Sequence, residues 1–139
     1  MRAWLAVLCV LLGTSLAHAQ RTRPSHELCD PKNLSGRPYF VCLERAVFDT
    51  NRQLDELTAR IFELIESRGD LAPAQKGRWK SSLEEAQILF VRFRNQECQA
   101  VAPFEGTKSG RIGAFDERLT CLVDKNVTRM RELEARYLK

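Results

Sequence analysis

The central segment of the chain is WKSSLEEAQILFVRFRNQEC, residues 79–98. Apolar residues recur in it every three or four positions, at Trp79, Leu83, Ala86, Phe90 and Phe93. This spacing predicts a helix with one apolar face, because 3.6 residues complete a turn. Ile88, Leu89 and Val91 widen the apolar band, so we expect this helix to contact neighbours on two sides and to be the central element of the domain.

The segment before it predicts another long helix. From Cys42 to about Arg68, apolar residues recur at helical spacing and no Gly or Pro interrupts them. We expect Gly69 to end this helix, because glycine readily takes the left-handed conformation found after a C-terminal turn. Pro73 then opens the central helix, since proline is tolerated in a first turn.

A third helix is predicted from roughly residue 114 or 116 to residue 138. Its apolar stripe is interrupted by Asn126, which we interpret as a buried residue that hydrogen bonds to a neighbouring helix. Between this helix and the central one, Pro103, Gly106, Gly110 and Gly113 predict a flexible connection. The expected fold class is all-α, a small antiparallel bundle of three main helices.

The first 19 residues have the pattern of a signal peptide. A basic start is followed by an apolar run from Ala3 to Leu16 and by the small residues of Ala17-His18-Ala19. The run is shorter than the roughly 20 residues that span a bilayer, although an uncleaved anchor remains the alternative. We therefore expect a signal peptide at 1–19, a leader and disulfide loop at 20–41 and one helical domain at 42–139. The product would be periplasmic or secreted, without an integral membrane segment after cleavage.

Four cysteines follow the cleavage site, at Cys29, Cys42, Cys98 and Cys121. An even number in a small exported domain predicts two disulfides that staple the bundle, in one of three connectivities. Position favours Cys29–Cys42, which would close a short loop, and Cys98–Cys121, which would join the ends of two antiparallel helices. A zinc site is the alternative, but the chain has no C-x-x-C pair and His26 is the only histidine left.

Charge and composition exclude several classes of function. The formal net charge is +4 and falls to +3 on cleavage, because Arg2 is the only charged residue removed. The charges are interspersed, which is typical of solvated helix faces and gives no support for nucleic-acid binding. With one histidine, and with carboxylate pairs only at neighbouring positions such as Glu84 and Glu85, no catalytic constellation is expected. We predict neither an enzyme nor a bound metal or cofactor.

LEEAQILFVRFRNQEC, residues 83–98, resembles the central motif of the LprI-like lysozyme inhibitor N-terminal domain family. The matching positions are Leu83, Ala86, Gln87, Phe93, Arg94, Glu97 and Cys98, followed by Cys121, Arg129 and Leu133. The resemblance implies an exported, disulfide-bonded, all-helical bacterial domain, named for a member that inhibits lysozyme. Gln87, Arg94 and Glu97 also share one helix face, so a polar network that braces the bundle is the structural alternative for them.

These expectations lead to one hypothesis and one alternative. The chain is an exported helical protein that inhibits a lysozyme or related cell-wall hydrolase by occlusion, or else an envelope interaction module without inhibitory activity. The predicted contacts are Lys108 and Arg111, because catalytic carboxylates in a hydrolase cleft attract cations. An acidic patch at Glu56, Glu63 and Glu66 is the second candidate surface, since lysozymes are usually cationic.

Overall fold

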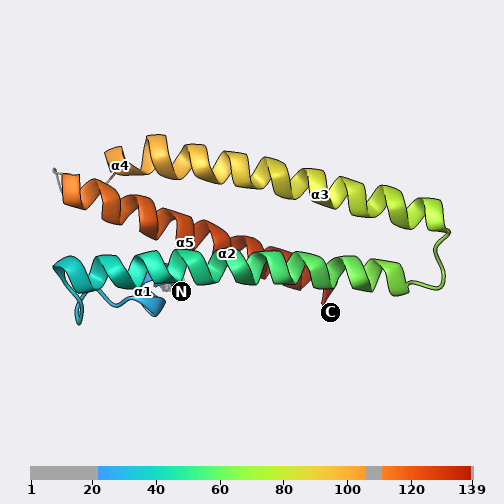
Figure 1. Cartoon of the computed structure of the whole chain (residues 1–139), viewed down its shortest axis with the longest axis horizontal. Coiled ribbons are helices and arrows are strands. Elements are labelled where there is room, and N and C mark those ends of the chain that lie inside the picture. The colour runs from blue at the N-terminus through green and yellow to red at the C-terminus, as the bar shows by residue number, and fades with distance from the viewer. Residues whose placement is uncertain (1–21, 106–110, 139) are drawn as a thin grey trace, which may run out of the picture.

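The computed structural model describes residues 22–105 and 111–138, which are mainly helical and contain no strand. The elements are α1 (Pro24–Leu28), α2 (Gly36–Ser67), α3 (Pro73–Gln96), the π-helical segment η1 (Glu97–Val101), α4 (Ala102–Glu105) and α5 (Arg111–Tyr137). Figure 1 shows α2, α3 and α5 running lengthwise with alternating direction in an elongated bundle. The predicted all-α antiparallel bundle of three main helices is confirmed.

Helix α2 is the element around which the core forms. The largest buried cluster takes Leu54, Leu57, Ile61 and Ile65 from α2, but only Leu83 from α3 and Leu133 from α5. A second cluster packs Tyr39, Leu43 and Ala46 of α2 against Cys29 and Val123. The prediction that residues 79–98 form the central element is therefore wrong. The buried apolar residues of α2 form one continuous stripe, whereas the apolar residues of α3 are spread around its circumference.

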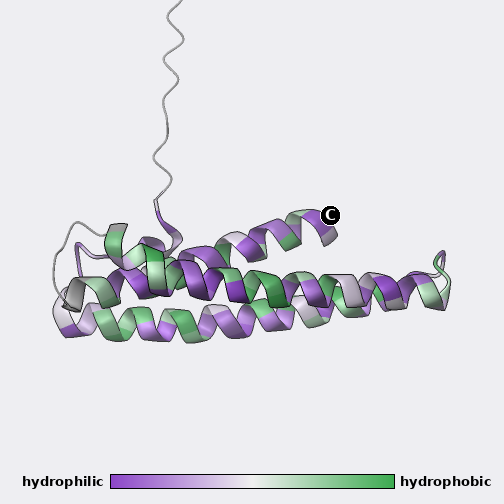
Figure 2. Cartoon of the chain, turned by 90° about the horizontal axis from the view of Figure 1, so that it is seen from above, coloured by the Kyte–Doolittle hydropathy of each residue, from purple (hydrophilic) through white to green (hydrophobic). Residues whose placement is uncertain are grey.

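The face of α3 that points inward differs from the predicted one. Trp79 and Phe90 pack against the main cluster and Leu83 is buried, as expected. Phe93, however, is 54% exposed, and Ile88 and Leu89 are exposed as well. Figure 2 shows hydrophobic and hydrophilic residues alternating along the long helices. In α3 this pattern left the helical phase ambiguous, so the prediction that Phe93 faces the core is wrong.

The phase of α3 predicts unequal effects of truncating two of its apolar residues. Leu83→Ala should lower the free energy of unfolding by about 2 to 4 kcal/mol, because it removes buried apolar contacts and leaves a cavity. Phe93→Ala should change it by less than about 1 kcal/mol, since that ring lies mostly in solvent. Urea unfolding followed by circular dichroism measures both, and a larger loss from Phe93→Ala would contradict the observed phase.

Helix α2 begins six residues before the predicted start at Cys42. Pro38 lies in its first turn, where the missing N–H is not needed for a helical hydrogen bond. Gly36 takes a positive φ of 59°, which glycine adopts without strain. At the other end the helix stops at Ser67 because Arg68 is extended, so the left-handed conformation predicted for Gly69 is wrong. The predicted start of α3 at Pro73 is confirmed.

Two segments expected to be irregular are partly helical. Residues 24–28, predicted as part of a loose leader, form α1, and Ser25 is fully buried. In the predicted connection between α3 and α5, residues 97–105 continue as η1 and α4, and α5 already begins at Arg111. Residues 106–110 lie outside the described residues, as does the predicted signal peptide.

Candidate binding surface

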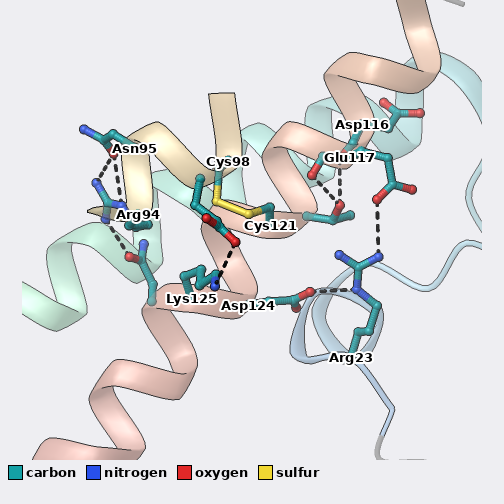
Figure 3. The surroundings of a disulfide bond; sticks show 12 residues. Arg23, Arg94, Asn95, Cys98, Asp116, Glu117, Cys121, Asp124 and Lys125 are labelled. Carbon is teal, nitrogen blue, oxygen red and sulfur yellow. Dashed lines mark hydrogen bonds and ion pairs between the residues drawn. A yellow bond between two sulfur atoms is a disulfide. The ribbon is translucent and has the colours of Figure 1, made fainter. Parts of the chain in front are cut away.

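Two disulfides hold the ends of the helices together. Cys29–Cys42 joins the segment after α1 to α2, and Cys98–Cys121 joins η1 to α5. Both pairings agree with the prediction. Figure 3 shows the second bridge, and Cys98 is fully buried in a cluster with Ala102 and Leu122. The bridge thus fixes the point at which the chain leaves α3 for α4.

Arg94 lies buried between three helices and forms no ion pair with a carboxylate of the described residues. Its side chain is directed to amides: Nη1 donates to Asn51 of α2 at 2.8 Å and to Asn126 of α5 at 2.6 Å, and Nε donates to Asn95. Asn126 is fully buried and donates in turn to Thr50 and Asn51. Burial lowers the pKa of Arg94, and the negative charge of Asp55 partly opposes that shift. The predicted hydrogen-bonding role of Asn126 between helices is confirmed.

A second polar connection lies two turns away along α3. Arg129 of α5 donates from Nε to the side-chain oxygen of Gln87 at 2.7 Å, and the Gln87 amide donates to Thr58 of α2. The ring of Phe90 lies near two cations, with the guanidinium of Arg94 at 5.9 Å and that of Arg129 at 5.5 Å from its centroid. Three family-motif residues, Gln87, Arg94 and Arg129, therefore link α2, α3 and α5.

The fourth motif residue, Glu97, takes part in a looser contact at the edge of the bundle. Its carboxylate lies 3.9 Å from the ammonium of Lys125. The same ammonium stands 5.0 Å above the centroid of Phe93, so an exposed aromatic ring of α3 still contacts α5. Glu97 and Lys125 are each about one third exposed, which leaves both accessible to a partner.

Arg23 fastens the N-terminal segment to α5. Its Nε donates to Asp124 at 2.7 Å and its Nη1 lies 3.4 Å from Glu117, as Figure 3 shows. The backbone N–H of Ser25 donates to the other oxygen of Asp124. Burial of Arg23 disfavours its charge, but the hydrogen bond and charge of Asp124 prevail and raise its pKa. The start of the described chain is therefore docked on the bundle, which the sequence did not indicate.

Only one of the two predicted contact residues belongs to a described helix. Lys108 lies outside the described residues, and Arg111 is the first residue of α5. Of the acidic patch, Glu56 pairs with Arg52 at 2.7 Å and Glu66 pairs with Lys80. Glu63 is exposed and has no ion pair within the described part of the chain. Basic neighbours thus neutralise two of the three acidic charges on this face of α2.

Sequence reasoning missed the exposed aromatic residues at the end of the bundle where α4 lies. Phe104 of α4 is 88% exposed and Phe115 of α5 is 52% exposed. Phe115 also lines a cavity of about 280 Å³ together with Gly36, Arg37 and Phe40 from the start of α2. Both rings are large apolar side chains left in solvent, and such side chains are candidates for contact with a partner. Neither ring stood out in the sequence, because exposure depends on the packing of three helices.

A comparison with known families identifies the chain. The model of the family described as lysozyme inhibitor LprI matches residues 31–133, well over half of the 139 residues. The chain belongs to this family. The match confirms the resemblance seen in residues 83–98 and includes Cys42, Cys98 and Cys121. No curated protein and no solved structure matches the chain.

The described part of this LprI family member contains neither a metal-binding cluster nor a membrane-spanning helix. Among residues 22–105 and 111–138, no group of three or more His, Cys, Asp and Glu side chains is placed to hold a metal ion. None of the helices in those ranges combines the length and hydropathy of a membrane span.

Proposed function

We propose that the protein is exported and inhibits a lysozyme or a related cell-wall hydrolase by binding over its active site. The observation that carries this proposal is the family match, which covers α2, α3, η1, α4 and most of α5. Export is supported by the two disulfides, since such bonds persist in oxidising compartments. Inhibition by occlusion needs a rigid surface, not a catalytic group.

The architecture supports binding without rearrangement. Two disulfides and the hydrogen bonds of Arg94, Asn126 and Gln87 fix the three long helices relative to one another. A surface held in its binding conformation loses little conformational entropy when a partner docks. We propose that Lys108 and Arg111, which lie in the sequence between the exposed Phe104 and Phe115, contact the target, because a cation attracts the carboxylates of a glycosidase cleft.

Lysis of cell walls by several lysozymes, titrated with the oxidised protein, tests this function. We expect stoichiometric inhibition of at least one enzyme. Lys108→Glu with Arg111→Glu should raise the inhibition constant by about tenfold or more, which corresponds to about 1.4 kcal/mol. The matched control is Arg60→Glu with Arg78→Glu, because both cations are exposed on other parts of the bundle.

The outcomes separate the competing hypotheses. If no lysozyme is inhibited while the protein retains a partner from envelope extract, it is an interaction module instead. The formal net charge, +3 after removal of the predicted signal peptide, favours that alternative when the target is a cationic lysozyme, because like charges slow the encounter. Equal loss of inhibition in the test and control variants would move the contact away from Lys108 and Arg111.

A further inference from the structure

Helices α2 and α3 form an open groove to which α5 contributes no lining residue. The groove has a volume of about 530 Å³, and its apolar lining includes Ala59 and Phe62 of α2 and Ile88 and Val91 of α3. Ile88 is 48% exposed, although it lies between two long helices. An apolar groove between antiparallel helices is the shape that receives a further helix.

One stripe of α2 continues this groove along the bundle, and its Phe62 is partly buried against the main core cluster. Phe48, Asp55 and Phe62 follow one another at intervals of seven residues and therefore share one helix face. Phe48 is 61% exposed. The two rings stand about 10 Å from Asp55 on either side, since each residue of a helix rises 1.5 Å. The stripe thus places one acid between two apolar side chains.

Hydrogen bonds between the helices fix which residues of α2 and α3 lie at the same level. Gln87 reaches Thr58, and seven residues further along α3 Arg94 reaches Asn51. Because the helices are antiparallel, Asp55 lies level with residue 90. Arg92 is two residues beyond that level, about 3 Å along the axis, on the other side of the groove.

Asp55 and Arg92 line the groove and form no ion pair in the described structure, although the charge of Asp55 also acts on the buried Arg94. Asp55 and Arg92 are both exposed, and neither lies within 4.0 Å of an opposite charge. Three charged residues line the groove, Asp55, Glu84 and Arg92. Glu84 lies six residues, about 9 Å, from the level of residue 90. Asp55 and Arg92 lie at nearly the same level on opposite sides, so this acid and this base make the middle of the groove self-complementary. A two-fold axis between them brings the acid of each copy to the base of the other.

We propose that a second copy of this chain occupies the groove in a symmetric dimer. The two-fold axis passes between Asp55 and Arg92, so that each Asp55 faces Arg92 of the other copy. The same symmetry carries Ile88 of one copy toward Phe48 of the other. Two α2/α3 pairs then form a four-helix core, in which apolar contacts provide affinity and the ion pairs fix register.

Charge reversal followed by mixing tests the pairing. In a dimer of the Asp55→Arg variant, the new arginine of each copy faces Arg92 of the other copy. In a dimer of the Arg92→Glu variant, the new glutamate of each copy faces Asp55 of the other copy. Each variant should dimerise at least tenfold more weakly than the unaltered protein in sedimentation equilibrium from about 1 to 200 µM, a range suited to a micromolar interface. An equimolar mixture should form a heterodimer with both pairs opposite in charge, and its dissociation constant should return to within about threefold of the original.

A matched pair of neighbouring variants tests the apolar contact. Ile88→Lys should abolish the dimer, whereas Leu89→Lys should leave it unchanged, because Leu89 is exposed but does not line the groove. Thermal unfolding should be similar in both, since neither residue is buried. A protein that stays monomeric at 200 µM, a dimer that survives Ile88→Lys, or a mixture that fails to associate would each overturn the proposal.

Discussion

Asn126→Leu is expected to lower the free energy of unfolding by about 3 to 5 kcal/mol. The substitution removes the side-chain oxygen of Asn126, which accepts a hydrogen bond from Nη1 of Arg94 at 2.6 Å. This position has no access to water. Arg94 then keeps its charge inside the bundle with fewer hydrogen bonds, and a buried charge that loses a partner is strongly destabilising. The amide of Asn51 would also lose the N–H that Asn126 donates to it.

Urea unfolding of the oxidised protein measures this loss, with Thr128→Ala as the control on an exposed position of the same helix. The control should stay within about 0.5 kcal/mol of the original. The double variant Arg94→Met with Asn126→Leu should lose less than the sum of its single variants, because it removes the charge together with its acceptor. Additive losses would show that the two side chains do not act as a unit.

Removal of the Cys98–Cys121 bridge is expected to have the second large effect. Cys98→Ala with Cys121→Ala should lower the free energy of unfolding by about 3.5 kcal/mol, from the entropy of the unfolded chain that a loop of this length restricts. Alanine is the suitable replacement because Cys98 is fully buried and a serine hydroxyl would lack a partner.

The other bridge provides the comparison. Cys29→Ala with Cys42→Ala opens a shorter loop and should lower the free energy of unfolding by about 3 kcal/mol. If the α4 end contacts the hydrolase, loss of Cys98–Cys121 should also weaken inhibition under conditions where the protein remains folded. Loss of Cys29–Cys42 should affect inhibition less. The reverse order would place the contact near α1.

The sequence alone was sufficient to predict the three long helices and the two bridges. Apolar residues at steps of three and four predict a helix whatever its neighbours are, and Pro73 marks a helix start by its own geometry. The spacing of four cysteines along antiparallel helices made Cys29–Cys42 and Cys98–Cys121 the favoured pairs. The motif in residues 83–98 was specific enough to indicate the family.

The tertiary structure decided how those helices face one another. Periodicity gives the apolar face of α2, but α3 has apolar residues on all sides, so only its partners determine that Leu83 is buried and Phe93 is not. The sequence suggested Arg94 as part of a bracing polar network, but only the structure shows that Asn51 and Asn126, which are distant in sequence, accept its hydrogen bonds. Burial and hydrogen bonding depend on which side chains meet across three helices, and a pattern within one helix does not contain that information.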